Sequence, residues 1–128
     1  MHELSVAQAI LQRVEAEAQA AGLAAIRRIK LEVGSLAGIV PASLSFCFEA
    51  AARGTVAEGA GLEIELLASK GRCLEGDHDF AFEGHTFACS LCGSARFRIT
   101  GGRELFIVEL EGDREAEQAV SSTGLGNA

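Results

Sequence analysis

Residues 72–97 read RCLEGDHDFAFEGHTFACSLCGSARF and contain three of the four cysteines of the chain. Cys89 and Cys92 form a C-x-x-C pair, which supplies two thiolates at the spacing of two corners of a zinc tetrahedron. Cys73 offers a third thiolate, and the fifteen residues between it and Cys89 suit the strand, turn and strand of a zinc ribbon. The stretch therefore predicts a small metal-binding subdomain whose fourth ligand has to be found elsewhere.

The fourth ligand is open because Gly76 stands where a second cysteine of the first pair would be. We predict His78 as this ligand, since three cysteines and one histidine are a common set for structural zinc. Asp77 lies closer to the vacant position, but a carboxylate is a less usual companion of three thiolates. His85, a water molecule or no fourth ligand at all are the remaining alternatives.

Thiol redox chemistry is the main alternative use of a C-x-x-C pair, and a zinc-free protein with a lowered Cys89 pKa would favour it. That motif usually opens a helix, whereas Gly93 and Ser94 follow here and then a short segment that predicts a strand. Cys47 lies on the apolar face of a predicted helix, where we expect a small core residue and not a ligand.

Two helices are predicted before the cysteine-rich stretch. Apolar residues recur at helical spacing over 4–21, and Gly22 is a natural helix stop. Ser5, with Gln8 three residues later, suggests a capping box at the start of this helix. Pro41 suits the first turn of a second helix with the sequence ASLSFCFEAAARG, because the missing N–H of proline is not needed there.

Three strands complete the expected core. Residues 26–33 and 61–69 alternate between apolar and charged side chains, which indicates half-buried strands. Residues 103–111 are apolar on both faces, as a central strand would be. We therefore expect an α/β (α+β) fold: a small three-stranded sheet with two helices, plus an inserted zinc-ribbon subdomain.

These elements divide the chain into three parts. Residues 1–69 and 103–111 form the predicted α/β core. Residues 70–102 form the inserted zinc-binding subdomain. Residues 112–128 are polar and rich in small side chains, so we expect a mobile tail.

Composition excludes several classes of function. The formal net charge is −7 and the basic residues are scattered, which argues against a nucleic-acid partner. No apolar run reaches about 18 residues, so no membrane span is expected. The start of the chain lacks a secretory signal, which indicates a cytoplasmic protein whose cysteines serve metal or thiol chemistry. No recognisable catalytic motif is present, and we predict that the protein is not an enzyme.

The first residues, MHE, offer a second metal site. The α-amine of Met1, the backbone nitrogen and imidazole of His2 and the carboxylate of Glu3 are the kind of donors that Ni(II) or Cu(II) prefers. Histidine at position 2 is too bulky for the usual removal of Met1. A histidine at this position is also common by chance, so the pattern alone does not separate a metal site from a solvated terminus.

Together these features resemble the HypA/HybF family, the nickel metallochaperones of NiFe-hydrogenase maturation. The resemblance implies that His2 is the essential nickel ligand, helped by the terminal amine and by Glu3. It also implies that the three cysteines of the inserted segment hold structural zinc, although Gly76 departs from the four-cysteine pattern of the family. The matching stretches are MHELS (1–5), KLEVGSLAGIVPASLSFCFEAAARGTVAEGAGLEIE (30–65), CSLCGS (89–94) and GGRELFIVELE (101–111).

The resemblance also implies partners. These are the GTP-hydrolysing accessory protein HypB and the large subunit of a hydrogenase, and some members of the family also supply urease maturation proteins. We expect no nucleic-acid or membrane partner, and either a monomer or a homodimer. The alternative is a zinc-ribbon scaffold that binds a protein partner and never carries nickel; nickel binding that survives the loss of the His2 imidazole would favour it.

Overall fold

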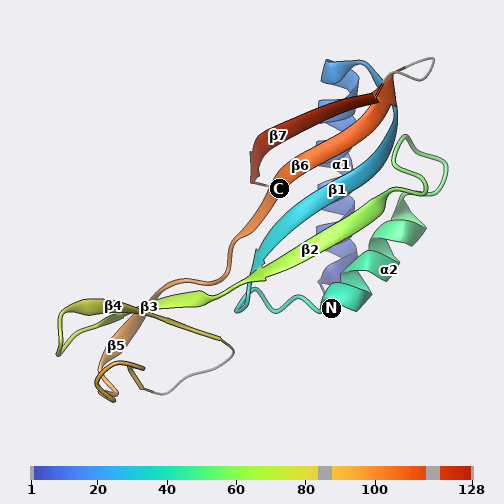
Figure 1. Ribbon diagram of the computed structural model, residues 1–128. Coiled ribbons are helices and arrows are strands. Elements are labelled where there is room, and N and C mark those ends of the chain that lie inside the picture. Colours follow the sequence, from blue (N-terminus) through green and yellow to red (C-terminus); the bar gives the residue numbers. More distant parts are fainter. Residues whose placement is uncertain (1, 84–87, 115–118, 128) are drawn as a thin grey trace.

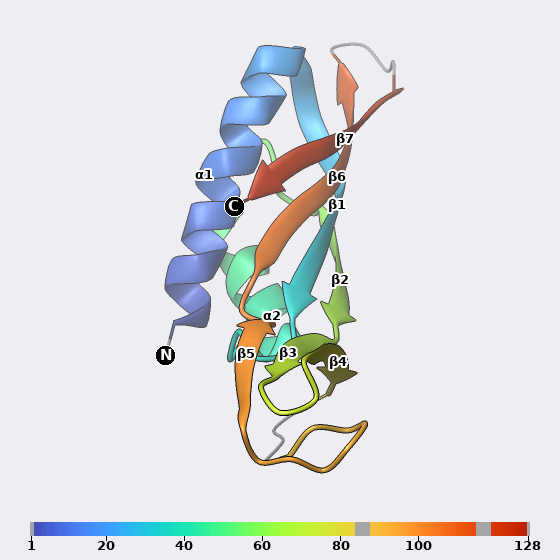
Figure 2. The ribbon, with the colours of Figure 1, turned by 90° about the vertical axis from the view of Figure 1, so that its left-hand side faces the viewer.

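The computed structural model describes residues 2–83, 88–114 and 119–127, the last of these through its backbone alone. A four-stranded sheet forms the main body, and two helices cover one of its faces (Figure 1; Figure 2). A second, three-stranded sheet projects from one end of this body (Figure 1). The elements in chain order are α1 (Glu3–Ala21), β1 (Leu23–Gly34), α2 (Pro41–Ala51), β2 (Gly61–Leu67), β3 (Ser69–Cys73), β4 (His78–Phe82), β5 (Phe97–Gly101), β6 (Leu105–Arg114) and β7 (Ala119–Asn127).

Helix α1 packs along the main sheet with its apolar stripe. Ala7, Ile10, Val14 and Ala18 are buried at intervals of three or four residues, which puts them on one helical face. Gly22 ends the helix with a φ of 74°, as expected for a left-handed cap.

The predicted capping box of α1 is wrong. His2 is the N-cap residue, and among the described residues its side chain makes no capping hydrogen bond. Ser5 lies inside the first turn, where its hydroxyl donates to the carbonyl of His2 at 3.3 Å. The helix thus begins earlier than the Ser5–Gln8 pattern indicated, and this places His2 directly at its N-terminus.

Helix α2 begins at Pro41, as predicted, with Val40 as its N-cap residue. Leu44 and Phe48 are buried against the sheet. Cys47 is partly buried and packs at the edge of the same core, in agreement with a structural role.

The main sheet has the strand order β2-β1-β6-β7. Strand β1 pairs in parallel with β2 and antiparallel with β6. Because β6 pairs with β7 on its other side, β6 is internal, as its apolar sequence predicted. The predicted strand 61–69 is divided in the structure: β2 stays in the main sheet, and β3 continues into the second sheet. The fold class is therefore confirmed, with the position of the second sheet between β2 and β6 in the chain.

The C-terminal segment differs from the expected mobile tail. Residues 112–114 continue β6, and residues 119–127 form β7, which pairs antiparallel with β6. The main sheet consequently has four strands and not three. Composition missed this strand because pairing with the edge of β6 uses backbone N–H and C=O groups, which every non-proline residue carries.

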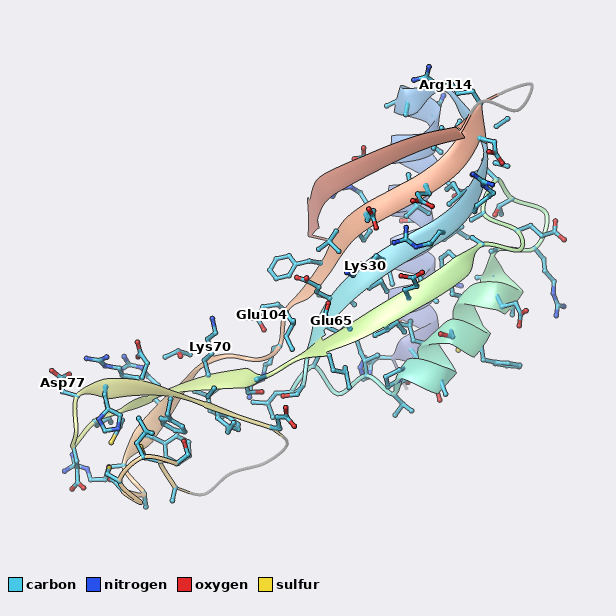
Figure 3. The ribbon with its side chains drawn as sticks, in the orientation of Figure 1. Lys30, Glu65, Lys70, Asp77, Glu104 and Arg114 are labelled. Atoms are coloured by element: carbon cyan, nitrogen blue, oxygen red, sulfur yellow. The ribbon has the colours of Figure 1, made fainter. Side chains whose placement is uncertain are left out.

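The face of the main sheet that the helices leave open carries charged side chains. Arg28 on β1 forms ion pairs with Glu63 on one neighbouring strand and with Glu109 and Glu111 on the other. Lys30 lies 3.8 Å from Glu65 in the same layer (Figure 3). Charged side chains thus cover one face of the sheet, and apolar side chains cover the face that packs in the hydrophobic core. This difference between the two faces fixes the register of the strands.

The second sheet has the order β4-β3-β5, and both of its pairings are antiparallel. Among the residues that the structure describes, its buried core contains only Cys73, Phe80 and Cys89, against which Phe82 and Phe97 pack. Phe80 meets Phe97 edge to face, with ring centroids 5.6 Å apart. So small a core is below what usually holds a domain together, and a bound metal is the common remedy.

Candidate metal centre

Four side chains gather beside the small core of the second sheet. The Sγ atoms of Cys73, Cys89 and Cys92 and a ring nitrogen of His78 all lie within 4.8 Å of one another. Three sulfurs and one imidazole nitrogen at this spacing suit a tetrahedral metal ion such as zinc. The structure therefore brings together the four side chains that the sequence proposed as ligands.

A tight hairpin positions the first half of the cluster. Cys73 ends β3 and His78 begins β4, and the two residues are opposite each other in the antiparallel register. Between them Asp77 adopts a φ of 51°, a left-handed conformation that aspartate tolerates better than most residues. This turn directs the chain back so that the imidazole faces the cysteines.

The second half is a turn at residues 89–93. The N–H of Gly93 donates to the carbonyl of Cys89 at 2.8 Å, and Gly93 has a φ of 79°. The N–H of Leu91 points at Cys89 Sγ, at 3.4 Å. In the first half, the N–H of Gly76 points at Cys73 Sγ in the same way, at 3.3 Å. Backbone donors of this kind stabilise a thiolate and hold it in place.

His78 and Cys89 form the closest polar contact of the cluster, with His78 Nε2 3.1 Å from Cys89 Sγ. Burial raises the pKa of the Cys89 thiol, but hydrogen bonds from the Leu91 N–H and from His78 outweigh it and bring this pKa down to about 6. The contact with Cys89, together with one to the backbone of Gly76, raises the pKa of His78. A metal ion would replace the proton shared by this pair.

Cys92 differs from Cys89 in its electrostatics. The Ser94 backbone favours the Cys92 thiolate, but the Cys73 thiol, with its Sγ at 3.6 Å, together with burial and the contact with Cys89, outweighs it, so that the pKa of Cys92 is raised. Crowded sulfurs therefore resist full ionisation in the metal-free state, and a divalent cation would relieve that repulsion.

A lowered cysteine pKa also suits redox chemistry, but the local structure does not. Residues 90–92 form a turn, and the chain then runs to strand β5 without a helix. The C-x-x-C pair thus lacks the helix N-terminus at which redox pairs of this kind usually lie.

The other candidate ligands are placed differently. The carboxylate of Asp77 pairs with Arg72 at 2.6 Å, and its side chain is 89% exposed at the tip of the second sheet (Figure 3). Asp77 is not one of the four groups of the cluster. His85 lies outside the described residues.

The predicted nickel site lies at the end of the main body from which the second sheet projects (Figure 1; Figure 2). His2 is exposed, and its imidazole lies beside Gly38, since a Cβ built there would be 3.6 Å from His2 Cε1. Glu3 is only 6% exposed, and its Oε2 accepts a hydrogen bond from the Val40 N–H at 3.2 Å. That bond is the main reason why the pKa of Glu3 is lowered. Met1 lies outside the described residues.

The neighbourhood of His2 was not predictable from the sequence. No pattern indicated that the loop before α2 would lie against the first residues of the chain. The hydrogen bond between Glu3 and Val40 joins the starts of α1 and α2, a structural role for Glu3 that the sequence pattern did not indicate.

Fold and site together define a small α+β protein whose inserted sheet carries three cysteines and one histidine at a spacing that suits a metal ion. The sequence model of one family, described as "Hydrogenase/urease nickel incorporation, metallochaperone, hypA", matches residues 1–112. The chain belongs to this HypA family, whose role is nickel incorporation for hydrogenase maturation.

Individual relatives agree with the family assignment. The hydrogenase maturation factor HypA of Chlorobium luteolum is 42% identical over 117 residues, which cover 91% of this chain and 100% of the relative. The factor of the same name from Streptomyces avermitilis is 46% identical over 112 residues, which cover 86% of each chain.

Solved structures show the same fold. A structure described as the solution structure of HypA protein aligns with a TM-score of 0.66 at 25% identity, and the match covers 90% of this chain and 98% of that one. The solution structure of the Ni metallochaperone HypA from Helicobacter pylori aligns with a TM-score of 0.62 at 23% identity, over 90% and 100% of the two chains. Across the part of our chain that the structure describes, no helix is long and apolar enough to cross a membrane.

Proposed function

We propose that this protein is a nickel metallochaperone that binds Ni(II) at its first residues and delivers it during NiFe-hydrogenase maturation. The observation that supports this most directly is the exposed imidazole of His2 at the N-terminus of a chain whose family is named for nickel incorporation. The sulfur-rich cluster lies in the second sheet, whereas His2 lies at the start of α1. The cluster has the donor set of structural zinc. The two metals would therefore occupy separate sites.

The nickel site would use few fixed donors. His2 supplies an imidazole and a backbone nitrogen, and the terminal amine supplies a third nitrogen, which together favour Ni(II). Glu3 contributes through its carboxylate, one oxygen of which accepts the Val40 N–H. An exposed site of this kind releases its ion readily, because a partner can replace the donors one after another.

The zinc site would use Cys73, His78, Cys89 and Cys92. Zinc bound there would supply no catalysis. It would join β3, β4 and the 89–93 turn around a core that has three buried hydrophobic residues in the described part of the segment. The protein would thus act as a carrier and not as an enzyme.

The partners proposed for this carrier are the GTP-hydrolysing protein HypB and the large subunit of a hydrogenase. Urease maturation proteins are a further proposed recipient, in line with the family description. The protein would act as a monomer or as a homodimer.

Nickel titration of the untagged protein tests the proposal. Wild type should bind Ni²⁺, and His2→Ala should lose most of this binding, because an imidazole and its geometry are removed from a site with few donors. A residue added before Met1 should have a similar effect, since it moves the terminal amine. His85→Ala is the control, because it removes a histidine without touching the terminus.

Two results would count against the nickel site. Equal nickel stoichiometry in wild type and His2→Ala would favour a zinc-ribbon interaction scaffold. Unchanged binding after the N-terminal addition would exclude a role for the terminal amine. Calorimetry and metal analysis of the same samples would also show whether zinc stays bound throughout.

A further inference from the structure

The turn between β3 and β4 contains a glycine whose missing side chain makes room for the histidine of the metal centre. We propose that Gly76 is a positioning residue that determines the ligand set: a side chain at position 76 and the His78 imidazole in the cluster exclude each other. The inference rests on the proposed zinc site and goes beyond it, because it identifies what selects a histidine in place of a fourth cysteine.

The backbone around Gly76 still has the hydrogen bonding of a metal-binding turn. The Gly76 N–H contacts the sulfur of Cys73, three residues earlier, at 3.3 Å. The backbone of Cys92 contacts the sulfur of Cys89, also three residues earlier. Position 76 therefore corresponds to position 92, and the first turn lacks only the second sulfur.

The space at position 76 is occupied by the imidazole of His78. A Cβ built on Gly76 would lie 2.3 Å from His78 Cε1 and 2.5 Å from His78 Nδ1. Carbon atoms do not approach so closely, so any side chain at position 76 would force the ring to move. Gly76 is not among the glycines with a left-handed backbone, which leaves this space as the physical reason for a glycine.

The imidazole cannot move aside and remain in the cluster. His78 begins β4 and pairs with Cys73 in the register of the sheet. Its Nε2 lies 3.1 Å from Cys89 Sγ, and its ring also hydrogen-bonds to the backbone of Gly76. Displacing the ring breaks both of these contacts, and such outer contacts are what hold a histidine in a binding orientation.

Two substitutions at position 76 distinguish the effect of filling the space beside His78 from the effect of adding a metal ligand. Gly76→Ala fills the space without adding a donor, so it should remove the imidazole from the metal and leave three thiolates. Gly76→Cys fills the same space and adds a sulfur, so it should give a four-thiolate site that no longer depends on His78. Gly61→Ala is the matched control, because a Cβ there would meet its nearest neighbour, the carbonyl of Arg27, at an ordinary 3.8 Å.

The test uses the full-length protein loaded with Co²⁺, whose absorption reports the number of thiolate ligands, and zinc competition with a chelator. We expect Gly76→Ala to hold zinc at least about ten-fold more weakly than wild type. Adding His78→Ala to Gly76→Ala should cause no further loss, since the imidazole is already displaced. Gly76→Cys should show a four-thiolate cobalt spectrum that is unchanged when His78→Ala is added.

The outcomes distinguish this inference from the zinc site on which it rests. If wild type takes up neither cobalt nor zinc, the zinc site is wrong and the proposed role of Gly76 is wrong as well. If wild type binds cobalt and Gly76→Ala gives the same spectrum and the same zinc retention, only the proposed role of Gly76 is overturned. A Gly76→Cys protein that still loses zinc when His78 is replaced would overturn it as well.

Discussion

Glu3 shows how one side chain can join two parts of the proposed nickel site. Its carboxylate is buried beside the start of α2 and accepts the Val40 N–H, so it stabilises the loop against which His2 lies. A carboxylate next to a helix N-terminus is also favoured by the helix dipole. Glu3 therefore supports the position of His2, whatever its own contact with nickel.

This contact predicts a pH dependence of folding. Because the Val40 hydrogen bond lowers the pKa of Glu3 in the folded protein, the contribution of Glu3 is fully present above its ordinary value of 4.5. It is lost as the pH falls through the folded value. We expect Glu3→Gln to lower the free energy of unfolding at neutral pH and to flatten its decline in acid.

Urea denaturation of metal-free wild type and Glu3→Gln at a series of pH values measures this effect. Glu49→Gln, at an exposed position of α2, is the control and should leave the curve unchanged. Parallel curves for wild type and Glu3→Gln would show that the Val40 contact does not discriminate between the charged and the neutral carboxyl.

The residues of the candidate metal centre were predictable to different degrees. The C-x-x-C spacing and the distance to Cys73 follow from how a metal-binding turn is built, so these cysteines could be found in the sequence. The choice between His78 and Asp77 could not be derived in the same way. It depends on the left-handed turn at Asp77 and on the space beside Gly76 that the His78 imidazole fills. The sequence shows the glycine but not which side chain takes that space.

At the scale of elements, the connection between the two sheets depends on close contacts between backbone segments. A Cβ on Gly34, at the end of β1, would lie 2.2 Å from the carbonyl oxygen of Gly102. The Gly102 carbonyl accepts the Leu36 N–H at 2.7 Å, and the Ser35 and Ser69 hydroxyls lie 2.5 Å apart. The loop after β1 is therefore bound to both chain segments that lead into the second sheet.

We expect Gly34→Ala to destabilise the protein by about 1–3 kcal/mol or more, because the methyl group meets backbone that has little freedom to move. Gly61→Ala, at the start of β2, is again the control, and it should change the free energy of unfolding by much less. Thermal and urea denaturation of both variants measure the difference. Equal stabilities of the two variants would mean that the chain at Gly34 and the chain at Gly102 can move apart at a low cost in free energy.

The elements of the main body were largely predictable, and the exceptions have physical causes. Periodicity identified both helices and the strands of the core, because burial of one face imposes it. It could not show that residues 61–73 form strands of two different sheets. Leu66 continues the apolar alternation of Leu62 and Ile64 in the sequence, but in the structure it is 53% exposed and burial moves to the odd-numbered positions from residue 67 on. It also missed β7, whose pairing with β6 depends on backbone groups.

The side chains that the structure describes form two hydrophobic cores of very different size. The main core contains fifteen of these buried residues, from both helices, β1, β6 and the connector after α2. The second sheet has three, two of which are cysteines of the candidate metal centre. Burial of apolar surface is the main stabilising term, so the main body should fold without metal while the second sheet should depend on it.

Removal of the metal should therefore unfold one part of the chain and leave the other. After chelation we expect backbone amides of β3, β4 and β5 to exchange with solvent rapidly, while those of α1, β1 and β6 keep their protection. Returning zinc should restore the protection, because metal binding supplies the missing free energy of folding. Hydrogen exchange on the untagged protein measures each strand separately. Uniform loss of protection would show that both sheets fold as one unit, and full retention would show that the aromatic contacts of Phe80 suffice without metal.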